Sequence, residues 1–147
     1  GSEMCIRDSF MNMDIDDRFP IKWKTDDKLT VCNINADKDL LKRAISNLIQ
    51  NSITHNENGC AIYVSVSTYN NKCIICVEDN GIGVSDEQIE KLNHTPHYMV
   101  CDTNTTEQRH GLGLLIVKQI MDGHSGTVII EHSEYYGGFK TELTISL

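Results

Sequence analysis

The sequence contains no apolar run approaching the ~20 residues that a membrane-spanning helix needs, and no signal peptide is visible. It is also poor in basic residues, with 13 Lys and Arg against 21 Asp and Glu. The resulting net charge of −8 argues against non-specific binding to nucleic acid or to an anionic membrane, since both need a basic surface. A phosphate ligand stays possible, because backbone N–H groups, one or two cations and Mg²⁺ can hold it.

The 147 residues are enough for one domain with a single hydrophobic core. Hydrophobic residues make up 39% and charged residues 23%, which is typical of a globular chain. We expect residues 1–12 to be a disordered cloning scar or leader, because they begin Gly1-Ser2 and continue mostly polar. Residues 13–147 are then the folded domain.

Six cysteines are scattered along the chain, and two of them form a CxxC motif, Cys73 and Cys76, inside an apolar run. On a strand, residues three apart point to opposite faces, so this motif is poorly shaped for a metal ion. The pattern favours reduced, structural thiols and a cytosolic setting over metal or redox use, which is the alternative.

Periodicity predicts an α+β two-layer sandwich, with one mixed sheet and three helices on one of its faces. Apolar residues at helical spacing predict three helices, with Asn35 and Ser85 as N-caps of the first two. The predicted helices span 36–55, 85–92 and 111–121. Alternating residues predict strands at 21–25, 29–32, 61–68, 72–78, 127–132 and 139–147, the first two forming a hairpin or two edge strands. The polar stretch 93–110 is predicted to be a long mobile loop, and such loops are usually functional.

Three residues of the first helix, Asn47, Asn51 and His55, form one column at the edge of its apolar stripe, because each step of four residues turns roughly 40°. An asparagine oxygen is a hard, neutral ligand suited to Mg²⁺. From the helix alone, hydrogen bonding of the two amides to neighbouring loops is the alternative.

Two glycine-containing segments accompany this column. Asp79-Asn80-Gly81-Ile82-Gly83 follows a buried strand, so its carboxylate can accept a hydrogen bond from a ligand amine. Its glycines allow close backbone approach and positive φ, although Asp-Asn-Gly is also ordinary turn chemistry. His110-Gly111-Leu112-Gly113 opens the last predicted helix, where free N–H groups suit a phosphate. It is neither a Walker A loop nor a dinucleotide fingerprint.

In this order, the three segments resemble the N, G1 and G2 boxes of sensor histidine kinase catalytic domains, which have the Bergerat fold. The resemblance covers roughly 26–147. It implies that Asn51 binds Mg²⁺ and that Asn47 supports the phosphates or metal waters. It further implies that a stretch within 93–110 is a mobile ATP lid. The implied ATP-binding residues are Asn51, His55, Asp79, Gly81, Gly83, Arg109, His110, Gly111, Leu112 and Gly113.

The sequence departs from the family pattern in three places. Thr54 stands where lysine is common, and Arg109-His110 replace the residues that usually precede the G2 box. The lid also lacks a clear phenylalanine motif over 92–99. The candidates for a phosphate-contacting cation are therefore Arg109 and a protonated His110 or His55.

Asn47 separates the subfamilies, because related ATPases and serine kinases carry a general-base glutamate there. Asparagine cannot act as a base, whereas neutral imidazole is already nucleophilic, so transfer to histidine is favoured. No histidine here matches the family's acceptor, which implies a phosphoacceptor on a separate dimerisation domain and a downstream response regulator. The resemblance also implies the cytoplasmic part of a membrane-bound sensor, without direct membrane or nucleic-acid contact by this domain.

Three alternatives stay open. One is a degenerate nucleotide-binding regulatory module without transfer activity. Another is ATP hydrolysis coupled to a conformational clamp, which Asn47 disfavours. A third concerns His94-Thr95-Pro96-His97, which lacks further ligands and is better explained as a solvated loop than as a metal site.

Overall fold

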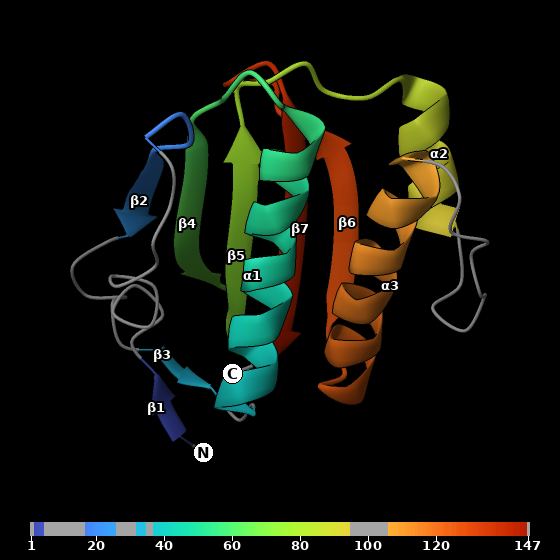
Figure 1. The fold of residues 1–147 in the computed structure, drawn as a ribbon. Helices are drawn as coiled ribbons and strands as arrows, with labels where there is room; N and C mark the ends of the chain where they lie inside the picture. The colour runs from blue at the N-terminus through green and yellow to red at the C-terminus, as the bar shows by residue number, and fades with distance from the viewer. Residues whose placement is uncertain (1, 5–16, 26–31, 35–36, 95–105, 147) are drawn as a thin grey trace.

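The computed structural model describes residues 2–4, 17–25, 32–34, 37–94 and 106–146, with side chains at 17–24, 37, 39–94 and 113–146. Its main feature is a five-stranded sheet in the order β2-β4-β5-β7-β6 (Figure 1). β2 is parallel to β4 and the other neighbours are antiparallel, so the sheet is mixed. The strands are β2 (Ile21–Thr25), β4 (Ile62–Tyr69), β5 (Lys72–Asp79), β6 (Thr127–His132) and β7 (Phe139–Ser146).

Helices α1 (Lys38–His55) and α3 (Thr106–Gly123) pack against each other over one face of this sheet, and α2 (Asp86–His94) contacts β6 (Figure 1). The predicted α+β two-layer sandwich is therefore confirmed. In the described part of the chain, no helix is long and apolar enough to cross a membrane.

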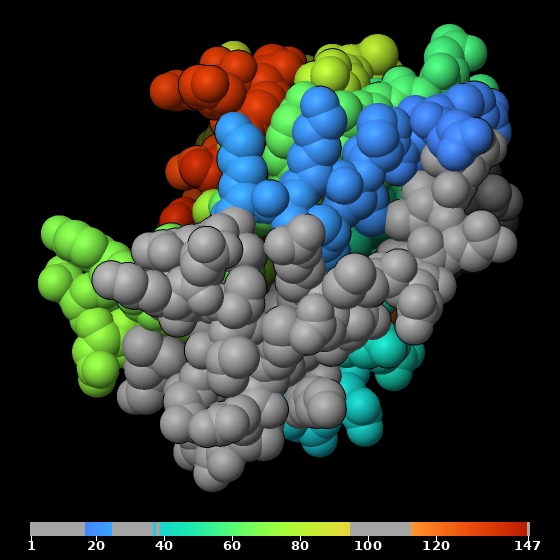
Figure 2. Space-filling model, turned by 90° about the vertical axis from the view of Figure 1, so that its left-hand side faces the viewer, coloured from blue at the N-terminus to red at the C-terminus, as the bar shows by residue number. Residues whose placement is uncertain are grey.

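The first strands differ from the predicted hairpin. β2 is an edge strand that pairs with β4, and Figure 2 shows the segment that contains β2, in blue, on this side of the molecule. β3 (Cys32–Ile34) instead pairs with β1 (Ser2–Met4), which belongs to the segment expected to be a disordered leader. Residues 5–12 of the expected leader and 29–31 of the expected strand lie outside the described residues.

The core lies between the sheet and its helices, as the periodicity predicts. On α1, Leu41, Ile45 and Ile49 are fully buried. They belong to the same core cluster as Ile75 of β5 and Leu143 of β7, which are also fully buried. Burying a side chain of this size contributes about 1.5–3 kcal/mol, so this layer fixes α1 against the sheet.

The N-cap of α1 is Asp37, not the predicted Asn35. The Asp37 carboxylate accepts hydrogen bonds from the backbone N–H groups of Asp39 and Leu40, at 3.0 and 3.1 Å. Two of the four N–H groups that a helix start leaves unpaired are thereby satisfied. Asp37 N–H also donates to Nε2 of His124 at 2.8 Å, which ties this end of α1 to the segment after α3.

Ser85 caps α2 as predicted, through a reciprocal capping box with Gln88. The helix ends at His94, two residues later than expected. Near this end, the Asn93 side chain accepts from the N–H of Ile130 at 2.9 Å and donates to its carbonyl at 2.8 Å. Lys118 of α3 donates to the Leu92 carbonyl, so the end of α2 is attached to both β6 and α3.

Helix α3 begins at Thr106, five residues before the predicted start at Gly111. Residues 106–110 contain Glu, Gln and Arg, which are good helix formers, and a single glycine costs a helix only about 1 kcal/mol. The predicted loop 93–110 is therefore too long at both ends, and residues 95–105 lie outside the described part.

Candidate functional site

Two asparagines of α1 carry buried polar atoms that no described group satisfies. These atoms are Nδ2 of Asn47 and Nδ2 of Asn51. A buried amide without a hydrogen-bond partner typically costs about 1–3 kcal/mol, so such groups usually serve a ligand or a function. Turning the amide by about 180° exchanges its nitrogen for its oxygen. The same position can therefore present a donor to a phosphate or an oxygen to a cation.

Asn51 faces the G2 segment across the interface between α1 and α3. A Cβ added to Gly113 would lie 2.9 Å from Oδ1 of Asn51, closer than real Cβ contacts come. The structure thus brings together one residue from the predicted N box and one from the predicted G2 box. Glycine at position 113 lets the two helices meet at the Asn51 amide.

His55 lies on the same helix and is half-buried. Burial lowers the pKa of this imidazole, while the negative charge of Asp79 acts in the opposite direction. The net direction favours the neutral ring. The role of a protonated His55 as a phosphate-contacting cation stays a prediction, and it would need the charge of a bound phosphate to favour the protonated ring.

Asp79 ends β5 as a buried carboxylate that is only 1% exposed. Its Oδ1 accepts from the backbone N–H groups of Gly81 at 3.0 Å and Phe139 at 3.1 Å. Its Oδ2 accepts from the Ser52 hydroxyl at 2.8 Å. An ionised carboxylate has about four acceptor positions, so these donors orient the group and leave acceptor capacity on Oδ2.

The two glycines of the G1 segment have different roles. Gly83 has φ +69°, so it adopts the left-handed conformation that is expected for the glycines of this segment. Gly81 does not have a positive φ. Glycine is required at this position because a neighbouring side chain packs closely against its backbone. A Cβ at position 81 would lie 2.0 Å from Oδ1 of Asn56.

Sequence reasoning missed Ser52, Asn56 and Gly138, all of which contact this loop. A Cβ at Gly138 would lie 2.1 Å from Oδ1 of Asp79, although Gly138 is only part of the connection between the strands predicted at 127–132 and 139–147. In the sequence, Asn56 is only the residue that follows the helix predicted at 36–55. These roles depend on contacts between distant segments, and no local pattern signals them.

The G2 segment lies inside α3 and not at a helix start, contrary to the prediction. In a continuous helix the N–H groups of Gly111, Leu112 and Gly113 bond to carbonyls four residues earlier. In this conformation they do not present free donors to a phosphate. Arg109 and His110 are in the first turns of α3, and their side chains lie outside the described part.

Cys60 lies beside this network, with its thiol 3.8 Å from the Ser52 carbonyl. Burial raises the pKa of the Cys60 thiol from 9.0 to about 11, and the charge of Asp79 adds to the effect. The free cysteines Cys73 and Cys76 occupy alternate faces of β5, one buried and one half-buried. These thiols are therefore arranged as the strand geometry predicts.

The raised pKa of Cys60 predicts a stability change in alkaline solution. The unfolded thiol loses its proton first, so the free energy of unfolding should fall as pH rises from about 9 towards 11. Urea unfolding of wild type and Cys60→Ala between about pH 7.5 and 10.5 measures this. The free energy of unfolding should decline more steeply with pH in wild type than in Cys60→Ala, whatever the difference in stability between the two proteins at about pH 7.5. Parallel pH profiles would contradict the prediction.

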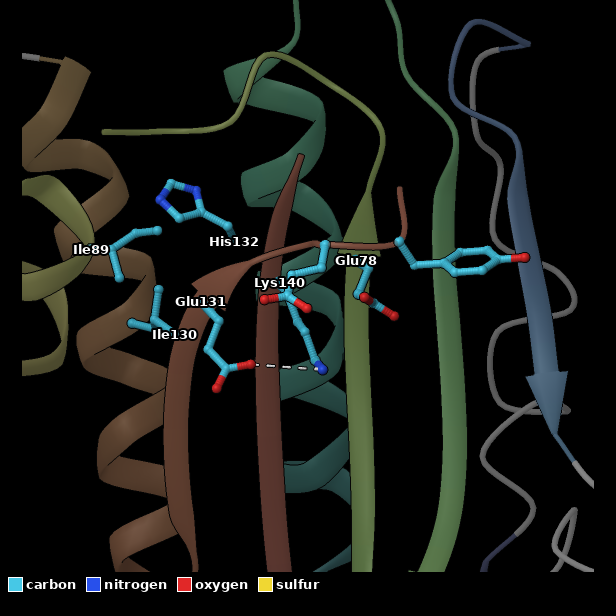
Figure 3. A pocket seen from close by; sticks show the side chains of 8 residues that line it. Glu78, Ile89, Ile130, Glu131, His132 and Lys140 are labelled. Atoms are coloured by element: carbon cyan, nitrogen blue, oxygen red, sulfur yellow. Dashed lines mark ion pairs between the residues drawn. The ribbon is translucent and has the colours of Figure 1, made fainter. Parts of the chain in front are cut away.

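A separate surface hollow of ≈ 620 Å³ lies near the β6–β7 hairpin (Figure 3). Its lining residues are Glu78, Ile89, Ile130, Glu131, His132, Glu134, Tyr135 and Lys140. Figure 3 shows the ion pair between Glu131 and Lys140, whose charged atoms are 3.7 Å apart. None of the predicted site residues lines this hollow, so it is distinct from the site around Asn51 and Asp79.

Known proteins that resemble this chain are histidine kinases and related ATPases. Residues 36–147 match the family model described as histidine kinase-, DNA gyrase B- and HSP90-like ATPase. Sporulation kinase B of Bacillus subtilis is 36% identical over 115 residues, covering 78% of this chain and 25% of that protein. The histidine-protein kinase BaeS of Escherichia coli is 28% identical over 117 residues, covering 80% and 24%. The chain thus spans about a quarter of the length of these relatives.

Solved structures show the same similarity. The histidine kinase domain of the Escherichia coli osmosensor EnvZ has a TM-score of 0.71 and 25% identity, covering 99% of this chain and 87% of that one. The catalytic domain of histidine kinase ThkA has a TM-score of 0.69 and 23% identity, covering 99% and 94%. The sheet and its three helices therefore have the arrangement of histidine kinase catalytic domains.

Proposed function

Because the chain belongs to the family of histidine kinase-, DNA gyrase B- and HSP90-like ATPases, we propose that it is the part of a sensor histidine kinase that holds Mg·ATP. It presents the γ-phosphate to a histidine on a separate dimerisation domain of the same kinase. The phosphoryl group then passes to a response regulator. The domain works on the cytoplasmic side of the membrane.

The observation that carries this proposal is the orientation of Asp79. Its carboxylate is buried and held by three donors, and acceptor capacity remains on Oδ2. A carboxylate can only accept hydrogen bonds, so it matches the 6-amino group of adenine and opposes a 6-oxo group. Gly83 adds no side chain to the loop after this carboxylate, which leaves room for a flat purine ring, whereas the space at Gly81 is filled by the Asn56 amide.

The amides of Asn47 and Asn51 support the phosphate end of the site. Both are partly buried on α1, with Nδ2 atoms that no described residue satisfies. Asn51 is the residue that would hold Mg²⁺, and Asn47 would support phosphate oxygens or metal-bound water. When bound, Mg²⁺ neutralises the charge on the phosphates. The chain's own contribution is to position the phosphates and to fix the direction of the γ-phosphate.

Asn47 also favours transfer to histidine over hydrolysis. An asparagine amide cannot take a proton from water or from a serine hydroxyl, whereas a neutral imidazole needs no such help. A clamp-type ATPase would need a base at this point of α1. The second candidate is a regulatory module that binds ATP without transferring phosphate, because the residues before the G2 segment depart from the family pattern.

Two measurements test the proposal. This chain alone should bind Mg·ATP and form no stoichiometric phosphohistidine, because its own histidines do not match the acceptor pattern. Addition of the dimerisation domain of the same kinase should lead to acid-labile labelling of that domain from γ-labelled ATP. ATP binding without labelling would favour the regulatory module. Absence of ATP binding would contradict both candidates.

A further inference from the structure

The end of α1 is joined to the G1 loop by a buried side chain outside the family motifs. Asn56 is the C-cap residue of α1 and is 6% exposed. Its Nδ2 donates to the Ser52 carbonyl at 2.8 Å, and its Oδ1 accepts from the N–H of Ile82 at 2.9 Å. One amide therefore connects the last turn of a helix to a loop 26 residues away.

The helix side of this connection explains why an amide is needed. At the C-cap, the backbone N–H of Asn56 bonds to Ile53, so it does not serve the Ser52 carbonyl four residues before it. The side-chain Nδ2 takes that place. A buried carbonyl is thereby satisfied, and the amide is held with Oδ1 directed at the loop.

The loop side is equally constrained. A Cβ at Gly81 would meet Oδ1, Cγ and Nδ2 of Asn56 at 2.0, 2.3 and 2.6 Å. The Asn56 amide therefore packs directly against the backbone at Gly81, and only glycine fits there. The side chain fixes both the hydrogen bond of Ile82 and the path of the chain one residue earlier.

Ser52 extends this connection to the carboxylate. Its hydroxyl donates a hydrogen bond to Oδ2 of Asp79, while its carbonyl accepts a hydrogen bond from Nδ2 of Asn56. Two residues of the last turn of α1 thus hold two points of the G1 loop, at Asp79 and at Ile82. The loop is attached to the helix that also carries Asn51.

We propose that Asn56 is a positioning residue for the purine, which holds the G1 loop in its binding conformation without contacting the ligand itself. This inference rests on the proposed ATP site. A loop already held in place loses less conformational freedom when the purine binds, so Asn56 contributes to affinity by pre-organisation. Loss of Asn56 should therefore reduce the affinity that comes from the purine contacts and leave the Mg²⁺-dependent gain in affinity unchanged.

Titration calorimetry with ADP, with and without Mg²⁺, tests this. Asn56→Ala should raise the ADP dissociation constant at least tenfold, with the ratio of the values with and without Mg²⁺ unchanged. The matched control is Asn58→Ala, an exposed asparagine in the same turn, which should bind like wild type. A purely structural role would lower the unfolding temperature and leave the affinity of the folded protein unchanged. Wild-type affinity in folded Asn56→Ala would overturn the inference.

A double variant gives a second, independent test. Gly81→Ala alone should reduce ADP binding strongly, because its methyl group would collide with the Asn56 amide. In the Asn56→Ala background that collision is absent. The factor by which Gly81→Ala raises the ADP dissociation constant should therefore be at least fivefold smaller there than in wild type. Purely additive losses would overturn the inference. If wild type itself fails to bind ADP, the proposed function fails instead.

Amide hydrogen exchange keeps the inference testable without any ligand. In the nucleotide-free protein, the N–H of Ile82 should exchange at least tenfold faster in Asn56→Ala than in wild type. The N–H of Gly81, which bonds to Asp79, serves as an internal reference for the same loop. Equal protection of Ile82 in the two proteins would overturn the role assigned to Asn56.

Discussion

Asp79→Asn is expected to weaken ATP binding about a hundredfold, which corresponds to the loss of a hydrogen bond to a charged acceptor. The two backbone N–H groups of Gly81 and Phe139 oblige the new amide to keep its oxygen at the Oδ1 position. Its NH₂ group then occupies the Oδ2 position, facing Ser52 and the ligand. The substituted side chain would thus present a donor to the adenine amine, which is also a donor.

The same geometry predicts a change of specificity. A 6-oxo purine offers an acceptor to that NH₂ group, so the ratio of ITP to ATP affinity should rise at least tenfold in Asp79→Asn. Calorimetry with both nucleotides measures the ratio. Glu78→Gln is the matched control, because Glu78 is the neighbouring carboxylate on the opposite face of β5, where it accepts from Ser133. The assignment of Asp79 is wrong if its variant keeps ATP affinity within threefold of wild type.

Asn51→Ala is expected to remove the Mg²⁺-dependent part of ATP affinity, about 10- to 100-fold, and to leave Mg²⁺-free binding nearly unchanged. Phosphoryl transfer to an added dimerisation domain should fall by about 10²–10³, since a group that positions charge in the transition state is lost. Calorimetry with and without Mg²⁺ and labelling with γ-labelled ATP measure the two effects.

The free energy of unfolding of Asn51→Ala should not fall together with its ATP affinity. Nδ2 of Asn51 is buried without a partner among the described residues, and alanine is a better helix former than asparagine. The nucleotide-free variant should therefore be as stable as wild type, or more stable by up to about 1 kcal/mol. Gln50→Ala, an exposed position next to it on α1, is the control and should keep both affinities. A large loss of stability in Asn51→Ala would show that the amide serves the fold.

Local patterns predicted the regular elements well, because those elements follow from periodicity and caps. The apolar stripe of α1 and the N-cap at Ser85 agree with the structure, and the gap between the strands predicted at 61–68 and 72–78 holds the turn at Asn70 and Asn71. Both asparagines of that turn have positive φ, at 49° and 61°. Such features depend on residues close together in the chain, which a sequence displays directly.

The missed features depend on residues far apart in the chain. The parallel pairing of β2 with β4, the start of α3 and the roles of Ser52 and Asn56 all arise from tertiary contacts. Ser52 stands inside the predicted N box, yet its bond to Asp79 crosses 27 residues. The motifs predict where the site lies, whereas the hydrogen bonds that support it can be identified only from the three-dimensional structure.

The Asn93 side chain has a consequence for how copies of this domain behave together. Strand β6 is an edge strand of the sheet, and the unpaired backbone groups of an edge strand can form hydrogen bonds with a strand of another molecule. Asn93 occupies both the N–H and the carbonyl of Ile130 there, as a neighbouring strand would. Pairing with a strand of another molecule is therefore blocked at Ile130. Two copies of this domain can therefore lie close together without pairing through β6 at Ile130.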